Sequence, residues 1–417
     1  MIVTADGALR SGNEPRRRSL KVCFAVPGFY PLLNRSIPGG IGGSEIRALT
    51  FARRLAGLNG YAVSAVAYDY GQPKVERYDV LTVYRDDFHR LRERKPQESS
   101  CFDGVAQAIR DWFRRPITTL LGPSESEAWR IADADVYCTF GASDYTSKLA
   151  NWCRSVDRPL VLFAGSDQDF SADYRPDSQD TNVWGSRCAW CYDAVVRAHV
   201  VVVQTNTQVR LLAERFGRRG IVIPNPIDLE SAQDSSAAQV RRIGLWAGKS
   251  DTVKRPELMV ELARLCPEVP FVMVLNRANP AVFEQVMARR PANLQIVEQV
   301  VPEEIGRLYA DAFALINTSR CEGFPNTFLE AGKYGIPVLS LEVDPDLILA
   351  RHQAGVVAGG DIQRLAETAR RFRADPGMAS KCGANLREYV RRRHALPDCV
   401  AQLDMLLQQL VSNGHPG

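Results

Sequence analysis

Short apolar runs alternate with longer amphipathic stretches along most of this chain. Runs such as residues 20–26, 200–203 and 314–316 are apolar at nearly every position, which is typical of parallel strands buried on both faces. The stretches between such runs, for example residues 257–265, are predicted to be helical. Strands that alternate with helices predict an α/β fold built on parallel sheets.

The same pattern gives the order of the elements. Strands are predicted at residues 20–26, 62–67, 136–139, 160–164, 200–203, 242–247, 271–275, 294–297, 314–316 and 336–340. Helices are predicted at residues 44–58, 146–154, 182–198, 209–216, 257–265, 280–290, 302–311, 326–334, 362–372, 379–393 and 396–411, with Ser44 as the N-cap of the first. A strand, a glycine-rich loop, a helix and a strand within residues 20–67 are typical of the start of a doubly wound domain.

The length of the chain, 417 residues, exceeds one ordinary core and predicts two domains. Pro224 and Pro226 force an extended path around Asn225, and the polar residues 231–239 that follow suit a linker. We therefore expect an N-terminal domain at residues 1–235 and a C-terminal domain at residues 236–396.

Composition and charge exclude several classes of protein. Apolar residues make up 45% of the chain and charged residues 24%, as in an ordinary globular protein, and a net charge of +4 does not indicate a nucleic-acid partner. The sequence has neither an apolar run long enough to span a membrane nor a signal peptide, so we expect a cytoplasmic protein. The basic runs 16–18 and 391–393 leave open a peripheral contact with an anionic membrane surface.

Ten cysteines are scattered along the chain, and Cys188 and Cys191 form its one C-x-x-C pair. A structural zinc site needs four ligands, and the sequence shows no second pair. We therefore interpret this pair as reduced thiols on a helix.

Residues 319–340 carry the clearest chemical signal. The turn Glu322-Gly323-Phe324-Pro325 precedes a helix whose first amides, at Asn326 and Thr327, have no partner within the helix and offer an anion site. Two carboxylates, Glu322 and Glu330, lie on either side of this helix start. They would repel a phosphate but can accept hydrogen bonds from sugar hydroxyls. An anion site between two such acceptors indicates a nucleotide-sugar ligand.

The segment E-G-F-P-N-T-F-L-E-A, residues 322–331, resembles the E-x7-E motif of the family-4 retaining glycosyltransferases, also described as glycosyl transferases group 1. The resemblance implies the GT-B fold, in which two Rossmann-like domains face a central cleft, and it implies that a final helix at residues 397–417 packs back on the N-terminal domain. It also implies that Glu322 faces the donor sugar and that Glu330 binds the ribose. An ordinary β-α-β crossover with solvated carboxylates is the alternative.

Three further segments fit a donor site of this kind. Gly42 and Gly43 let the backbone approach a ligand at the start of a helix, and they resemble the glycine loop that reaches the donor diphosphate, although a plain turn is equally compatible. Lys249 and Lys254 suit a diphosphate clamp, with Arg255 as a further candidate; the family usually has Arg at the first position, and two solvated lysines are the alternative. By resemblance, the loop at Val301 holds the base.

The sequence departs from the family pattern after the strand at residues 160–164. Many members have a histidine there, near the reacting carbon, where this chain has Gly165. Ser166, Asp167 or Asp169 could replace it on the acceptor side, or they could only cap the next segment. Residues 69–127 show no regular pattern, and we expect loops and helices there that shape an acceptor pocket.

Together these features predict a retaining, metal-independent hexosyltransferase that needs no cofactor. Its substrates would be a nucleotide-diphosphate sugar and a saccharide or lipid-linked acceptor, as in polysaccharide or glycolipid synthesis. Lys249, Lys254 and Glu322 are the predicted catalytic residues. Two alternatives share the fold: a nucleotide-sugar 2-epimerase, which the lack of histidines near the cleft disfavours, and a non-catalytic nucleotide-sugar-binding protein.

Overall fold

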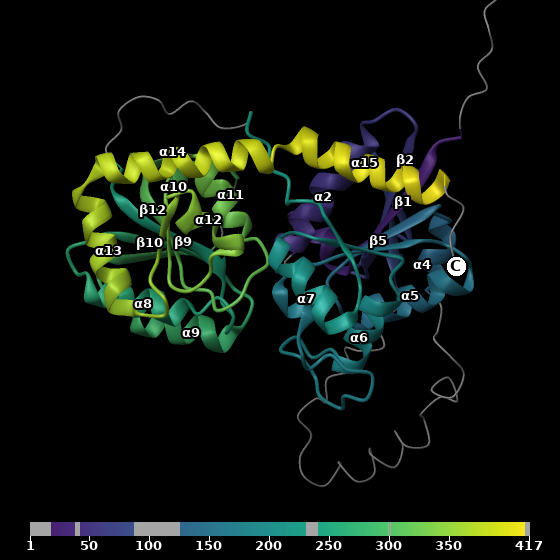
Figure 1. Ribbon diagram of the computed structural model, residues 1–417, viewed down its shortest axis with the longest axis horizontal. Coiled ribbons are helices and arrows are strands. Elements are labelled where there is room, and N and C mark those ends of the chain that lie inside the picture. The colour runs from purple at the N-terminus through teal and green to yellow at the C-terminus, as the bar shows by residue number, and fades with distance from the viewer. Residues whose placement is uncertain are drawn as a thin grey trace, which may run out of the picture.

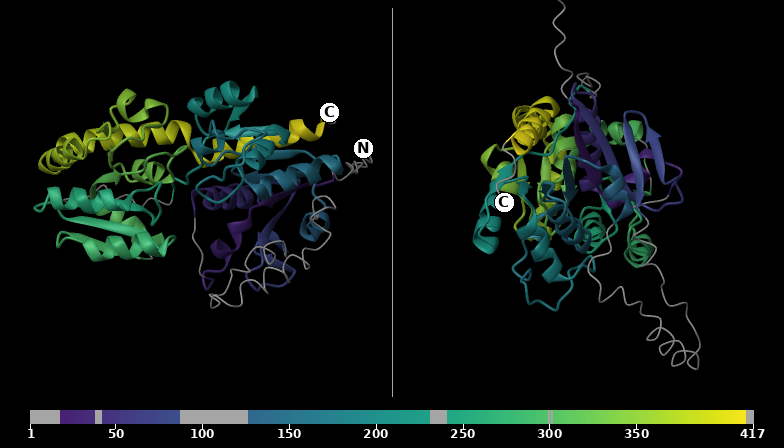
Figure 2. Two further views of the ribbon diagram at one scale, coloured as in Figure 1. Left: turned by 90° about the horizontal axis from the view of Figure 1, so that it is seen from below. Right: turned by 90° about the vertical axis from the view of Figure 1, so that its right-hand side faces the viewer.

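Each half of the chain builds its own sheet. The computed structural model describes residues 18–37, 42–86, 126–230, 241–298, 300 and 302–412. Within them, the first sheet has eight strands in the order β3-β4-β2-β1-β5-β6-β7-β8, and the second has six in the order β11-β10-β9-β12-β13-β14. The paired strands run parallel except β3 against β4. Figure 1 shows these two halves side by side, and they remain separate in the left view of Figure 2.

The ten predicted strands are present in the predicted order, and four further strands, β3, β4, β8 and β14, were not predicted. Those of the first sheet are β1 (Leu20–Ala25), β2 (Tyr61–Tyr68), β3 (Val75–Tyr78), β4 (Leu81–Asp86), β5 (Val136–Phe140), β6 (Leu160–Phe163), β7 (Val200–Val203) and β8 (Gly220–Val222). Those of the second are β9 (Ile243–Lys249), β10 (Phe271–Asn276), β11 (Leu294–Val297), β12 (Ala312–Asn317), β13 (Val338–Ser340) and β14 (Gly355–Val357).

Helices connect the strands. In the first half these are η1 (Pro27–Phe29), α1 (Tyr30–Leu33), α2 (Gly43–Ala56), α4 (Glu127–Ala132), α5 (Asp144–Ser155), η4 (Asp167–Phe170), α6 (Cys188–Arg197) and α7 (Asn206–Phe216). The second half has α8 (Pro256–Leu265), α9 (Pro280–Arg289), α10 (Pro302–Asp311), α11 (Asn326–Lys333), η5 (Pro345–Leu347), α12 (Ile348–Arg351), α13 (Ile362–Ala374) and α14 (Pro376–Arg393). The last helix is α15 (Leu396–Ser412).

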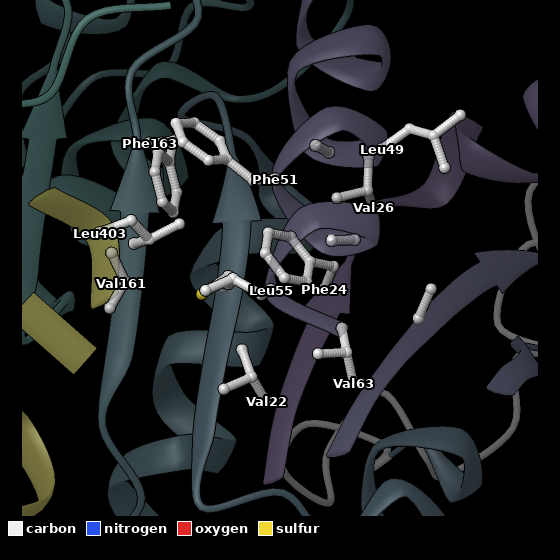
Figure 3. Close-up of a cluster of buried hydrophobic side chains, with 14 of the residues drawn as sticks. Val22, Phe24, Val26, Leu49, Phe51, Leu55, Val63, Val161, Phe163 and Leu403 are labelled. Carbon is white, nitrogen blue, oxygen red and sulfur yellow. The ribbon is translucent and has the colours of Figure 1, made fainter. Parts of the chain in front are cut away.

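Both faces of the first sheet are covered, which explains the unbroken apolar runs. Successive residues of a strand point to opposite faces. Val22 and Phe24 therefore pack with α2, while Cys23 and Ala25 belong to the cluster on the other face. Figure 3 shows Phe24 among the side chains of the first cluster.

The chain crosses back to the first half between its last two helices. α14 lies on the second half and α15 on the first, as Figure 1 shows. Leu403 of α15 is buried in the same cluster as Phe51 and Phe163 (Figure 3). At the crossing, Ile227 pairs with Ala395, and its amide donates to the His394 carbonyl over 2.9 Å. The boundary predicted at residues 235 and 236 lies outside the described residues.

The strand orders place the loops that matter at one edge. In the second sheet, β9 lies beside β12, and the strand order reverses between them. Ligands of such folds bind at the carboxyl ends of the strands around that reversal. The segments that follow β9 and β12 contain Lys254 and Glu322, so the topology brings together residues 68 positions apart.

Three local predictions were wrong. Residues 75–86 form the β3–β4 hairpin instead of loops and helices, and the predicted pocket residues 87–125 lie outside the described part. The helix predicted from residue 182 begins at Cys188, because the Asn182 side chain accepts from the amides of Trp184 and Ser186 in a competing turn. The N-cap of α2 is Gly42, not Ser44.

Candidate active site

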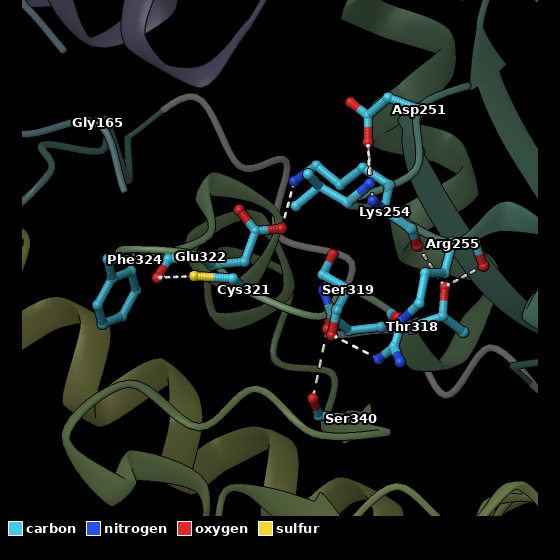
Figure 4. A network of polar contacts seen from close by, with 12 residues as sticks. Gly165, Asp251, Lys254, Arg255, Thr318, Ser319, Cys321, Glu322, Phe324 and Ser340 are labelled. Atoms are coloured by element: carbon cyan, nitrogen blue, oxygen red, sulfur yellow. Dashed lines mark hydrogen bonds and ion pairs between the residues drawn. The ribbon is translucent and has the colours of Figure 1, made fainter. Parts of the chain in front are cut away.

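The loop after β9 carries an ion pair that reaches residues 322–330, the segment with the E-x7-E pattern, which we call the central motif. Asp251 Oδ1 accepts from the amides of Val253 and Lys254 over 3.0 and 2.8 Å, which fixes the turn. Lys254 Nζ then pairs with Glu322 Oε1, and both side chains remain partly exposed. Figure 4 shows the lysine and the carboxylate pointing toward one another. The structure thus brings together two oppositely charged residues of the predicted site.

Lys249 approaches the glycine loop from the other half of the molecule. A Cβ placed on Gly42 would lie only 2.9 Å from Lys249 Nζ, and it would also collide with the Glu45 carboxylate. A side chain at this position would require the ends of Lys249 and Glu45 to move away. The Lys249 cation and the backbone before α2 therefore meet across the interface between the halves.

The start of α11 lies at the same place. Pro325 is its N-cap, and no side chain among the described residues caps the helix. The Asn326 amide group donates to the Gly43 carbonyl over 3.2 Å, so the helix start and the glycine loop touch. The backbone amides of Asn326 and Thr327 are the uncapped ones, and partial positive charge collects there.

Glu330 lies within α11 and is mostly buried. Burial raises the pKa of its carboxyl group, and the nearby Lys333 opposes the rise. Its carboxylate makes no hydrogen bond to the described residues. A ligand hydroxyl could supply that hydrogen bond.

Arg255 braces the loop instead of facing the glycine loop. Its guanidinium donates to the carbonyls of Thr318 and Ser319, over 2.7 and 3.1 Å, and to Glu342 over 2.7 Å. The Thr318 hydroxyl in turn contacts the carbonyls of Lys254 and Arg255. These bonds hold the lysine loop against the end of β12 (Figure 4).

Side chains of the first half form hydrogen bonds with Phe324 and Asn326 of the central motif. Asn225 donates to the Phe324 carbonyl over 3.0 Å and to Asn326 Oδ1 over 2.9 Å. The Gln204 side chain accepts from the Phe324 amide and donates to the Ala164 carbonyl. A Cβ on Gly323 would collide with Gln204, so this turn is packed tightly against its neighbour.

A histidine lies behind the same turn, but it is buried. The His394 ring is 4.3 Å from the Phe324 ring, and its Nδ1 lies 2.8 Å from the Asn225 carbonyl. Burial lowers its pKa to about 4, so the ring is neutral at pH 7 and Nδ1–H donates. It holds the motif in place and does not reach the cleft.

Ser44 lies close to Gly165, the position where the family pattern has a histidine. A Cβ on Gly165 would lie 2.9 Å from the Ser44 hydroxyl, so a side chain there would require Ser44 to shift. Ser166 is an N-cap whose hydroxyl accepts from the Gln168 amide over 3.2 Å. Asp169 accepts from the amides of Ala142 and Gly165, over 2.7 and 2.6 Å. Ser166 and Asp169 thus cap this segment.

Asp167 differs from its neighbours because its carboxylate caps nothing. Its amide donates to the Glu322 carbonyl over 3.4 Å, which puts it beside the motif of the other half. Burial raises its pKa to about 7; the Gln208 amide opposes the rise, and the charges of Asp169, Asp346 and Glu322 add to it. Asp167 is therefore a carboxyl group that changes charge near neutral pH.

Several predictions concern features away from this cluster. Val301, the residue predicted to contact the base, lies outside the described part of the chain.

In the described part, no group of three His, Cys, Asp or Glu residues could hold a metal ion. Across the same residues, no helix combines the length and apolar character needed to span a bilayer. Cys188 and Cys191 are buried free thiols on α6.

Two Rossmann-like halves built on parallel sheets define the GT-B fold, as predicted. Solved structures with this arrangement include sucrose-phosphate synthase from Thermosynechococcus elongatus (TM-score 0.69, 17% identity, 95% of this chain and 100% of that one). Anabaena HepE in complex with UDP has a TM-score of 0.63 at 13% identity (94% and 100%). The catalytic domain of starch synthase IV from Arabidopsis thaliana, bound to ADP and acarbose, has 0.62 at 14% (94% and 100%).

Sequence comparisons agree with the fold but cover less of the chain. The model of the family "Glycosyl transferases group 1" matches residues 251–375. A Xenopus tropicalis protein named glycosyltransferase 1 domain-containing protein 1 is 21% identical over 100 residues, which are 24% of this chain and 29% of that protein. The family match lies in the second half of the chain, which carries Lys254, Glu322 and Glu330.

Sequence reasoning missed the residues that join the two halves. Gln204 and Asn225, in the first half, each form a hydrogen bond with the backbone of Phe324 in the second half. The prolines on both sides of Asn225 were the available signal. No sequence signal indicated that Ser44 lies beside Gly165, because this contact depends on how the two segments pack in the fold.

Proposed function

We propose that this protein is a retaining glycosyltransferase that moves a sugar from a nucleotide-diphosphate sugar to an acceptor hydroxyl. One observation carries the proposal: Lys249, Lys254 and the uncapped start of α11 gather positive charge at the interface between the two halves. The donor diphosphate is the ligand that such a site suits best.

In this mechanism the bond between the anomeric carbon and the diphosphate oxygen breaks as negative charge grows on that oxygen. Lys254 would exchange Glu322 for the diphosphate, and the amides of Asn326 and Thr327 would donate to it. The freed Glu322 carboxylate would accept from sugar hydroxyls, while Glu330 would accept from the ribose. The acceptor oxygen bonds to the same face of the carbon, and its proton passes to a diphosphate oxygen. These charges make a divalent metal unnecessary.

Asp167 is our candidate for orienting the acceptor hydroxyl. It lies beside Glu322, and its carboxylate is not used by the cap of η4. Because its pKa is about 7, the carboxylate forms as the pH rises through neutrality, and transfer should rise with it. Asp167→Asn should remove this limb of the pH–rate profile, whereas Asp177→Asn, on an exposed residue, should keep it. A limb that persists in Asp167→Asn would contradict this role.

The test is the release of nucleoside diphosphate from candidate nucleotide-sugars with and without acceptors. We expect release that depends on the acceptor, an α-configured product from an α-configured donor, and a loss of about 100-fold or more in Lys254→Ala. Lys381→Ala, on an exposed residue of α14, is the matched control and should keep full activity. Release without acceptor and with inversion at C2 of the sugar would indicate the 2-epimerase, and full activity of Lys254→Ala would remove Lys254 from the site.

A further inference from the structure

A hollow of about 400 Å³ lies between the two halves and shares no residue with the donor site. Its walls come from the start of α7 in the first half and from η5, α12 and α14 in the second. The lining residues are Asn206, Asp346, Ile348, Arg351, His352, Asn385, Glu388, Tyr389, Arg392 and Arg393. A cavity of this volume accommodates a small metabolite.

The hydrogen-bonding groups that remain available in this hollow are mainly donors. The Glu388 carboxylate is bound by Arg391 and Arg392. The Arg351 and Arg393 guanidinium groups form no ion pair with a carboxylate of the described residues. Two guanidinium groups without a counter-ion can bind an anionic partner that is rich in acceptors.

The Asp346 carboxylate is also occupied, because it joins the two halves. It accepts from the backbone amides of Asn206 and Thr207 over 2.8 and 2.9 Å, and from both of their side chains. The backbone of Asp346 and Leu347 has φ values of 50° and 60°, a left-handed conformation that is rare outside glycine. This contact caps α7 and places Asn206 in the wall of the hollow.

An aromatic wall completes the hollow. The Tyr389 and His352 rings lie 4.8 Å apart, next to Ile348. Burial raises the pKa of Tyr389 to about 12, so its hydroxyl stays protonated and can donate. An aromatic surface beside guanidinium groups suits a phosphate ester with a small organic body better than a bare ion.

We propose that this hollow is a second ligand site that binds a small phosphate monoester. The ligand's phosphate pairs with Arg351 and Arg393, and its body lies against Tyr389 and His352. Because the walls belong to both halves, the ligand binds their closed arrangement and stabilises it.

The hollow is also connected to the donor site. Tyr389 stacks on Phe324 with ring centroids 6.4 Å apart, and Phe324 follows Glu322-Gly323 in the chain. A ligand that holds Tyr389 and the closed arrangement should therefore raise the affinity for the donor nucleotide. This coupling, unlike the binding itself, rests on the proposed function, and by linkage it must be reciprocal.

Calorimetry with glucose 6-phosphate as the probe, and inorganic phosphate for comparison, tests the site in the full-length chain. We expect the wild type to bind glucose 6-phosphate more tightly than phosphate. The double variant Arg351→Ala/Arg393→Ala should lose at least tenfold in affinity, and both arginines are exposed, so the fold should survive. Arg364→Ala, an exposed arginine of α13 away from the hollow, should bind as the wild type does.

Three outcomes would overturn the proposal: no binding by the wild type at millimolar probe, unchanged binding by the double variant, or binding that Lys254→Ala abolishes. The last would assign the phosphate to the donor site. Binding that survives in Lys254→Ala and fails in the double variant supports the hollow even if the protein transfers no sugar. A severalfold rise in affinity for nucleoside diphosphate with saturating probe supports the coupling, and an unchanged affinity contradicts it.

Discussion

The interface between the two halves has two sides of opposite character. On the donor side, Lys249 approaches Gly42, Lys254 pairs with Glu322, and the start of α11, whose backbone amides have no side-chain cap, touches Gly43. On the pinned side, formed by Asn225, Phe324 and His394, donors meet acceptors at 2.8 to 3.0 Å. Both sides flank the same turn of the central motif.

The difference separates residues that hold the motif from residues that can act on a ligand. Buried polar groups that are paired within the protein stabilise one arrangement and have nothing left for a substrate. Groups that burial has desolvated without full pairing are available, at some cost in stability. Substitutions on the pinned side should therefore change stability, and substitutions on the donor side should change binding.

The largest expected effect is the acid sensitivity of the pinned side. His394 has a pKa of about 4 in the folded protein, against about 6.5 when unfolded, so the unfolded chain binds more protons between these values. The free energy of unfolding should fall as the pH drops from 7 to 4, by about 3 kcal/mol from this residue. Denaturant unfolding of His394→Gln should lack this part of the loss, while His352→Gln, on an exposed residue, should follow the wild type. If the free energy of unfolding of His394→Gln falls with pH as that of the wild type does, the acid sensitivity does not come from His394.

Loss of the amide at Asn225 should have an intermediate effect. Asn225→Ala leaves the buried Phe324 carbonyl and Asn326 Oδ1 without their donor, and should lower the free energy of unfolding by about 2 kcal/mol. Asn385→Ala removes one exposed hydrogen bond and should stay within about 0.5 kcal/mol of the wild type. If the two variants unfold at the same denaturant concentration, Asn225 does not hold the motif.

The smallest effect, and the sharpest contrast, is expected at Glu330. Glu330→Gln replaces a carboxylate whose pKa is raised by burial with a neutral group of the same shape, so the unliganded protein should become slightly more stable at pH 7. The same change should weaken binding of free nucleotide by about tenfold, or 1.4 kcal/mol, because the ribose loses a charged acceptor. Calorimetry and thermal unfolding measure the two effects, with Glu367→Gln on α13 as control. Tighter nucleotide binding, or a loss of stability, would assign Glu330 to the scaffold.

The elements whose local sequence pattern is strong could be predicted from the sequence. The strand preceding the motif, the helix from Asn326 and the positive-φ Gly335 that ends it follow from apolar runs and stop signals. The β3–β4 hairpin was missed because β3 has no buried residue and β4 alternates buried with partly exposed positions, so neither strand shows an unbroken apolar run. Contacts between the halves, such as Asn225 with Asn326, could not be predicted, since they depend on how two separately folded sheets dock.

A crystal structure with a bound nucleoside diphosphate tests the central claim most directly. We expect the diphosphate beside Lys249 and Lys254, with its oxygens accepting from the amides of Asn326 and Thr327 and the ribose on Glu330. The ion pair of Lys254 with Glu322 should be broken in that complex. A nucleotide bound elsewhere, with this ion pair intact, would contradict the account.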